Sequence, residues 1–136
     1  MIVVVIPSYK VTGHILAVLD SIGEEVDKIL VVDDKCPDNS GKLVEGSVSD
    51  PRVEVIYRAV NGGVGAAVKS GYRRAMELDA DVVVKLDGDG QMDPALIGSF
   101  AAPILRGDAD YTKGNRFFEA DVVNRMPVIR LIGNAM

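Results

Sequence analysis

Four short runs of apolar, mostly β-branched residues constrain the fold of this chain more than any other feature. The runs cover residues 2–6, 29–32, 53–57 and 82–86. The first, second and fourth lack the alternation of apolar and polar residues found in a strand with one solvated face, so they predict strands buried on both faces of a parallel sheet. The third alternates somewhat and also predicts a strand.

Three further segments show the apolar spacing of helices. These segments are residues 12–22, residues 64–78 and residues 95–105. In the second segment, Val68, Tyr72, Ala75 and Met76 are expected to share the apolar face. Pro94 suits the first turn of the third, where its missing N–H does no harm.

The elements follow one another as strand, helix, strand, loop, strand, helix and strand. This order predicts an α/β fold: an open, mostly parallel sheet with right-handed crossovers and helices on both faces. With 136 residues, 48% of them hydrophobic, the chain can bury a substantial core. We therefore expect residues 1–136 to form a single domain.

Charge and cysteine content exclude several classes of function. The net charge is -5, and no basic stripe is present, which argues against nonspecific nucleic-acid binding. A single cysteine excludes an internal disulfide framework and a multi-cysteine zinc site, and it favours a reducing, cytoplasmic compartment. No window has the length and apolarity of a membrane span, so any work at a membrane is expected to be peripheral or to use sequence outside this chain.

Polar residues and glycines follow each predicted strand. In open α/β sheets, ligands bind where the loops leave the carboxyl ends of the strands. Three of these loops should therefore bring carboxylates, glycines and an aromatic ring to one edge of the sheet. In chain order the strands are followed by Pro7-Ser8-Tyr9, Asp33-Asp34, Tyr57-Arg58 with Asn61-Gly62-Gly63, and Asp87-Gly88-Asp89.

The segment "LDGDGQMDP" combines clustered carboxylates with glycines. Asp87, Asp89 and the Gln91 carbonyl offer hard oxygen ligands that suit Mg²⁺ or Mn²⁺. The segment does not match an EF-hand loop, because the glycine and the glutamate of that motif are missing from their positions. Asp93 precedes Pro94 and can instead cap the following helix. The sequence thus predicts a metal site at Asp87 and Asp89 and a structural role for Asp93.

The glycine loop "NGGVGAAVKSG" precedes a predicted helix. Backbone N–H groups in such a loop can lie near phosphate, which makes Gly63 a candidate contact. The loop matches neither a P-loop nor the G-x-G-x-x-G fingerprint. A tight turn followed by close helix packing through Gly65, Ala66 and Ala67 explains the glycines equally well.

Asp33 and Asp34 leave two alternatives open. One carboxylate can accept hydrogen bonds from a nucleobase or a ribose while the other holds the loop, or both can cap the local turn. Arg58 is expected to be solvated. Arg116, in "KGNRF", follows a predicted short strand and could bring its guanidinium to a diphosphate.

Together, these segments resemble the amino-terminal half of family 2 glycosyltransferases with the GT-A fold. The resemblance is greatest to the branch of dolichol-phosphate mannose synthases and polyprenyl-phosphate glycosyltransferases. It implies inverting transfer of a sugar from a UDP- or GDP-sugar, with Mg²⁺ or Mn²⁺ at the diphosphate and a lipid phosphate as acceptor. The residues that carry it are "VVIPSYK", "VVDDKCPDNSG", "RAVNGGVGAAVKSGYRRA", "KLDGDGQMDP" and "KGNRF".

The resemblance also implies a nucleoside pocket. Pro7 and Tyr9 would line it, and Asp34 would contact the base. The family often has Y-N-E after the first strand, whereas this chain has Tyr9-Lys10-Val11. The contact of the family's acidic residue is therefore not carried over.

The metal and catalytic residues are implied in the same way. Asp87 and Asp89 match the D-x-D motif of the family, and Gln91 lies where it can complete the metal shell. Arg116 matches the arginine of the G-[SN]-R segment, and Arg130 matches a later basic residue near the phosphates. Asp89, Arg116 and Arg130 are thus the expected catalytic residues.

In such enzymes the acceptor side lies beyond the nucleotide-binding half. The chain stops at "RLIGNAM", within a pattern that should continue as a helix. We therefore expect a domain truncated at its carboxyl end, which binds donor and metal but transfers sugar poorly. The parent protein is expected in the cytoplasm, at the cytoplasmic face of the membrane.

Two other functions fit parts of the pattern. A receiver domain of two-component signalling also has an acidic pair, a phosphorylated aspartate and a lysine at strand ends, but Lys113 follows Asp87 too closely for that arrangement. A nucleotidyltransferase shares the strand-end aspartates. It should carry a glycine-rich, basic signature after its first strand, and "PSYKVTGH" is not one.

Overall fold

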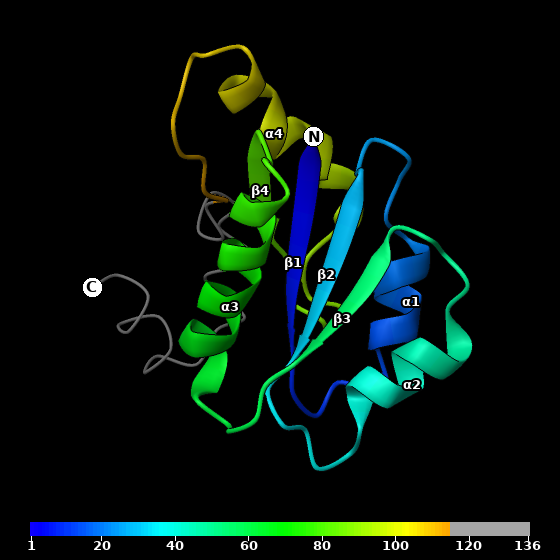
Figure 1. The fold of residues 1–136 in the computed structure, drawn as a ribbon. Helices are drawn as coiled ribbons and strands as arrows, with labels where there is room; N and C mark the ends of the chain where they lie inside the picture. The colour runs from blue at the N-terminus through cyan, green and yellow to red at the C-terminus, as the bar shows by residue number, and fades with distance from the viewer. Residues whose placement is uncertain (115–136) are drawn as a thin grey trace, which may run out of the picture.

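The computed structural model describes residues 1–114, in which four parallel strands form one sheet in the order β3-β2-β1-β4. All four predicted strands are present. They lie side by side in Figure 1, with their carboxyl ends at the bottom of the view. The strands are β1 (Ile2–Ser8), β2 (Lys28–Asp33), β3 (Val53–Tyr57) and β4 (Val82–Lys85).

Helices cover both faces of the sheet, which confirms the predicted fold class. Helix α3 packs on one face, and α1, α2 and α4 pack on the other (Figure 1). The third predicted helix begins with a 3₁₀ turn before α4. The helices are α1 (Ile15–Asp20), α2 (Ser40–Ser47), α3 (Gly63–Glu77), the 3₁₀ helix η1 (Pro94–Leu96) and α4 (Ile97–Leu105).

The central strand β1 supplies both halves of the core. Val4 and Ile6 face the α1 side of the sheet, whereas Val3 and Val5 face α3, and all four are fully buried. Each such side chain contributes about 1.5–3 kcal/mol to folding by leaving water. The continuous apolar run at residues 2–6 is thus explained by burial on two faces.

Helix α2 was expected as a loop, and that prediction is wrong. Its sequence SGKLVEGS contains two glycines and two serines, which have low helix propensity. The helix is held by tertiary contact instead, because Val44 is buried in the core beside α1 and β2. Helix α2 positions the loop that follows β2.

The predicted apolar face of α3 is right at Ala75 and wrong at Tyr72 and Met76. The residues buried against the sheet are Ala67, Gly71 and Ala75, while Tyr72 and Met76 are exposed. Small residues are needed because the helix approaches the sheet closely. A Cβ atom at Gly71 would lie only 2.3 Å from Cγ1 of Val5, whereas one at Gly65 would meet no atom within 4 Å. The close packing expected through Gly65, Ala66 and Ala67 therefore occurs at Ala67 and Gly71.

Two glycines of α3 should therefore respond oppositely to alanine. We expect Gly71→Ala to lower the free energy of unfolding by about 1–3 kcal/mol, because the new methyl group overlaps Val5 in a packed core. Gly65→Ala meets no atom within 4 Å and should raise it by about 0.5–1 kcal/mol through helix propensity. Urea denaturation of both variants measures the difference, and equal effects would contradict the close packing at Gly71.

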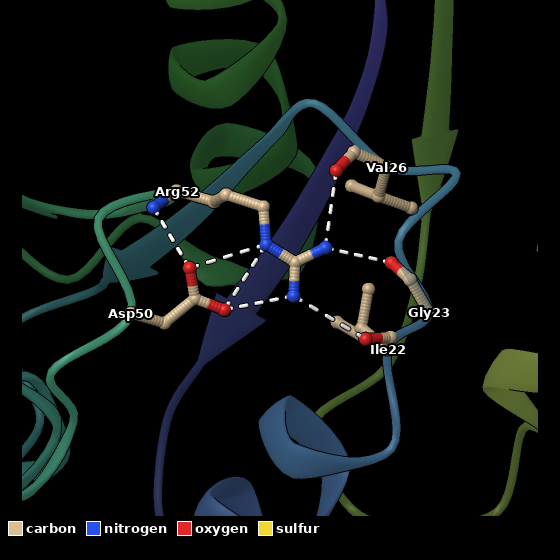
Figure 2. Close-up of polar contacts among 5 residues, drawn as sticks. All are labelled: Ile22, Gly23, Val26, Asp50 and Arg52. Carbon is tan, nitrogen blue, oxygen red and sulfur yellow. Dashed lines mark hydrogen bonds and ion pairs between the residues drawn. The ribbon is translucent and has the colours of Figure 1, made fainter.

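Arg52 ties together two loops at the amino-terminal edge of the sheet (Figure 2). Its guanidinium donates to the backbone carbonyls of Gly23 at 2.6 Å, Val26 at 3.1 Å and Ile22 at 3.3 Å. It also pairs with Asp50 at 2.7 Å. These bonds join the segment before β2 to the segment before β3. Arg52 is therefore a structural residue at the edge opposite the carboxyl ends of the strands.

Candidate functional site

A cavity of about 280 Å³ lies at the carboxyl ends of the strands. Residues from the loops after β1, β2 and β4 and from the first turns of α3 line it. β1 is the point where the strand order reverses, because the chain passes to β2 and β3 on one side of it and to β4 on the other. Open α/β sheets bind ligands at such a switch point. The lining residues are Pro7, Ser8, Tyr9, Lys10, Val11, Asp34, Val64, Ala67, Asp87, Gly88 and Asp89.

The aspartates after β4 are placed by two glycines. Gly88 is buried, and a Cβ atom there would lie 3.1 Å from Cδ1 of Ile15. Gly90 has a φ of +80°, which disfavours other residues. This turn lets Asp87 and Asp89 both line the cavity, with the exposed Asp89 accepting the Gln91 N–H at 3.1 Å.

Asp93 has the structural role that was predicted for it. Its carboxylate accepts the Ala95 N–H at 2.9 Å, at the start of the 3₁₀ turn that contains Pro94. It is not among the residues that line the cavity. The cluster of aspartates thus divides into two cavity residues and one helix cap.

Asp87 forms an ion pair with a lysine from its own strand. Nζ of Lys85 contacts Oδ1 of Asp87, and the two side chains are 32% and 33% exposed. Lys85 is the last residue of β4. A positive charge thus lies next to a carboxylate that lines the cavity.

Asp34 connects the end of β2 to the glycine loop. Its side chain is only 4% exposed. The carboxylate accepts the N–H of Gly63 at 2.8 Å and that of Gly62 at 3.1 Å. Nη1 of Arg58 lies 3.2 Å from Oδ1 of Asp34. Burial of a carboxylate is tolerated when it is paired and hydrogen-bonded, as it is here.

Arg58 was expected to be solvated, and the structure corrects this. Its side chain is 22% exposed, and its buried Nη1 makes the ion pair with Asp34 but no hydrogen bond among the described residues. A Cβ atom at Gly62 would lie 3.1 Å from both Nη1 and Nη2, so the guanidinium packs directly against this glycine. The signal was present in the sequence, because Arg58 follows β3 on the edge where Asp34 follows β2.

Asp33 holds the loop after β2. Its two oxygens accept the backbone N–H groups of Cys36 at 2.7 Å and Gly41 at 2.8 Å. Of the two alternatives for the acidic pair, loop holding therefore applies to Asp33. Asp34 bonds to residues more than 25 positions away rather than to its own turn.

Cys36 and two serines hold the loop after β1 in place. The Lys10 N–H donates to Sγ of Cys36 at 3.1 Å, and Ser8 donates to Ser40 at 2.8 Å in the interior. Desolvation acts to raise the pKa of the Cys36 thiol, but hydrogen bonds from Ser40 and Lys10 outweigh it, so the pKa lies below its usual range. Cys36 is thus part of the loop support.

The loop after β1 brings an aromatic ring and a cation to the cavity. Lys10 has a φ of +55°, and its Nζ lies 5.6 Å from the ring centroid of Tyr9. Tyr9 is 42% exposed, so part of its ring is open to a ligand. At the end of β3, desolvation and, to a smaller extent, a hydrogen bond to Glu45 raise the pKa of Tyr57 to about 12, which keeps this phenol neutral.

The structure gathers most of the predicted site residues. Pro7, Tyr9, Asp34, Asp87 and Asp89 all line one cavity. Their contacts with a donor or a metal stay predictions.

The other predicted residues lie elsewhere. Gln91 is exposed beside the cavity, and the N–H of Gly63 donates to Asp34, so a phosphate contact of Gly63 stays a prediction. Arg116 and Arg130 lie outside the described residues. Sequence reasoning missed Ser8 and Lys10, although both adjoin predicted residues in the same loop.

Asp87 and Asp89 supply two of the oxygen ligands that a divalent metal ion needs. Within residues 1–114, no three His, Cys, Asp or Glu side chains are grouped to hold a metal ion. Two carboxylates nevertheless suit Mg²⁺ or Mn²⁺, since these ions take one or two carboxylates and complete their shell with water and substrate phosphates. The residues therefore fit an ion that shares its coordination with a ligand.

Comparison with known proteins decides the family. The model of "Glycosyl transferase family 2" matches residues 3–134. This chain belongs to glycosyltransferase family 2. The match covers nearly the whole chain. It therefore decides against the two alternatives, a receiver domain and a nucleotidyltransferase.

Relatives confirm the resemblance to the polyprenyl-phosphate branch of family 2. A UDP-N-acetylglucosamine–dolichyl-phosphate N-acetylglucosaminyltransferase from Methanococcus voltae is 29% identical, covering 98% of this chain and 59% of the relative. A polyprenol monophosphomannose synthase from Mycolicibacterium smegmatis is 31% identical, covering 95% of this chain and 50% of the relative. The chain thus spans about half the length of these relatives.

A solved structure supports the fold. S. aureus TarS in complex with UDP-GlcNAc superimposes with a TM-score of 0.64 at 20% identity, covering 87% of this chain and 38% of TarS. The likeness confirms the GT-A, Rossmann-like arrangement of the sheet and helices. Within the described part of the chain, no helix has the length and apolarity to cross a membrane.

Proposed function

We propose that this family 2 domain binds a UDP- or GDP-sugar in the cavity at the carboxyl ends of the strands. We further propose that the protein containing it transfers the sugar, with inversion, to a polyprenyl or dolichyl phosphate. One observation carries the proposal: a single cavity brings together residues from three strand ends, including an aromatic ring and three carboxylates. The named activities of the relatives support the donor and the acceptor.

The nucleoside half of the donor is assigned to the loops after β1 and β2. Pro7 and the half-exposed ring of Tyr9 offer an apolar surface for the base. A carboxylate has about four acceptor positions. Gly62 and Gly63 already donate hydrogen bonds to Asp34, and Arg58 forms an ion pair with it, so acceptor capacity remains for an N–H or O–H of the ligand.

The diphosphate half is assigned to the loop after β4. Asp87 and Asp89 would hold Mg²⁺ or Mn²⁺, with Gln91 as a further ligand beside them. The ion, when bound, stabilises the negative charge that develops on the leaving diphosphate. Arg116 and Arg130 are proposed to add positive charge at the same phosphates. The cavity itself contributes Lys10, a cation at the end of β1.

The proposed donor binding is tested by calorimetric titration of the domain with UDP-, GDP- and CDP-sugars, with and without Mn²⁺. We expect binding of a UDP- or GDP-sugar that strengthens by at least about tenfold when Mn²⁺ is added, because Asp87 and Asp89 would hold the ion together with the phosphates. Absence of metal-dependent binding for all three sugars would contradict the proposal.

The acceptor is proposed to be a lipid phosphate because it is already an anionic nucleophile and needs no strong general base. We also propose that the parent protein works in the cytoplasm, at the surface of the membrane. With the complete protein, we expect sugar transfer to a polyprenyl phosphate and at least about 100-fold less to the matching polyprenol. Equal transfer to both, measured by product chromatography, would rule out the lipid phosphate as the required acceptor.

A further inference from the structure

Lys85 has no role in the proposed function, although it contacts one of its residues. It is the last residue of β4, and its Nζ pairs with Oδ1 of Asp87. Asp87 lines the cavity and is the proposed metal ligand. The ammonium group of Lys85 therefore neutralises the carboxylate at which a divalent ion is expected to bind.

Stability alone does not explain this pair. Both side chains are about one-third exposed, at 32% and 33%, and exposed ion pairs contribute little to folding. The pair has a larger effect on the binding of a second cation to Asp87. A divalent ion that approaches Asp87 meets the positive charge of Lys85, whose Nζ already pairs with Oδ1 of the carboxylate.

Lys85 can leave Asp87 without disturbing the strand. Lysine carries a compact charge on a flexible four-carbon stem, and it binds phosphate as a point charge. A metal ion that arrives with a nucleoside diphosphate brings a new anionic partner for the ammonium group. A metal ion that arrives alone brings none, so Lys85 then remains a competitor for Asp87.

We propose that Lys85 is a tethered counter-ion of the donor site: it occupies Asp87 in the free protein and transfers to the diphosphate when metal and donor bind together. This inference rests on the proposed function, because it requires the metal at Asp87. It assigns Lys85 as a donor-binding residue that disfavours metal binding without nucleotide. Metal and nucleoside diphosphate are therefore expected to bind cooperatively.

Substitution of Lys85 should move two affinities in opposite directions. In Lys85→Met, we expect Mn²⁺ alone to bind about 5–10-fold more tightly, because the competing charge is gone. At saturating Mn²⁺, we expect UDP or GDP, whichever the wild type binds, to bind about tenfold more weakly, because one phosphate contact is lost. Electron paramagnetic resonance of free Mn²⁺ measures the first affinity, and calorimetry measures the second.

Two control variants isolate the role of Lys85. Lys85→Arg keeps the charge at the end of β4, so both of its affinities should lie closer to those of the wild type than the affinities of Lys85→Met do. Lys69→Met makes the same substitution at an exposed position of α3, where the lysine forms no ion pair with another described residue, and it should change neither affinity. Thermal unfolding of Lys85→Met confirms that the variant is folded during the titrations.

The outcomes separate the inference from the function on which it rests. If the wild type binds a nucleoside diphosphate with Mn²⁺ and Lys85→Met changes neither affinity, or changes both in the same direction, the role of Lys85 is overturned and the proposed function stands. A wild type without any metal-dependent nucleotide binding overturns both.

Discussion

Replacing Asp89 with alanine is expected to weaken Mn²⁺-dependent binding of UDP or GDP by about 100-fold or more. Loss of a residue that only supports a metal ligand typically costs 10–100-fold in affinity or activity, so loss of a ligand should cost at least as much. The fold should tolerate the change, because Asp89 is exposed and its carboxylate accepts only the Gln91 N–H among the described residues. Calorimetry with the nucleotide that the wild type binds measures the loss.

Asp93→Ala is the matched control, because it removes a carboxylate from the same segment. Asp93 accepts the Ala95 N–H at the helix start and does not line the cavity. This variant should lose about 1 kcal/mol of unfolding free energy and keep its nucleotide affinity within about twofold. Asp89→Ala should instead keep its free energy of unfolding and lose nucleotide affinity. If both variants lost nucleotide affinity equally, the division of the aspartates into metal ligands and a helix cap would be wrong.

The strands and the location of the site could be predicted from the sequence because their signals are local. Each strand is a continuous apolar run, and parallel strands place the residues that follow them on one edge. That reasoning brought Tyr9, Asp34 and Asp87 to the same place without knowledge of any contact.

The errors arose where packing overrides local pattern. The face of α3 was assigned from its large apolar residues, but the sheet accepts only small ones where a Cβ atom at Gly71 would meet Val5. Helix α2 was missed because its glycines and serines are typical of loops, and burial of Val44 stabilises it. Such effects depend on neighbours from other elements, which periodicity does not report.

The different roles of Asp33 and Asp34 could not be predicted from the sequence, because they too depend on contacts with other elements. The partners of Asp33 lie three and eight residues away, and those of Asp34 lie in the loop before α3. Both carboxylates follow the same strand, so only the folded chain distinguishes them. Arg58 was underestimated because its partner, Asp34, lies on a neighbouring strand end.

Asp34→Ala is expected to lower the free energy of unfolding by about 3–5 kcal/mol. The buried carboxylate is the acceptor for Gly62 and Gly63 and the ionic partner of Arg58. Its removal leaves a largely buried guanidinium without its counter-charge, which is more costly than the loss of a neutral contact. Urea denaturation measures the change.

A double-mutant cycle with Arg58→Met shows how much of this cost belongs to the ion pair. When Arg58 is absent, Asp34→Ala no longer leaves a buried charge without its partner. The double variant should therefore be about 1–2 kcal/mol more stable than the sum of the two single changes predicts. We expect the lower part of this range, because the Arg58 side chain is 22% exposed and solvent screens the pair. Additivity within about 0.3 kcal/mol would mean that the glycine N–H groups alone hold Asp34 in place. In that case Arg58, whose Nη1 makes no hydrogen bond in the described residues, would owe its position to packing against Gly62.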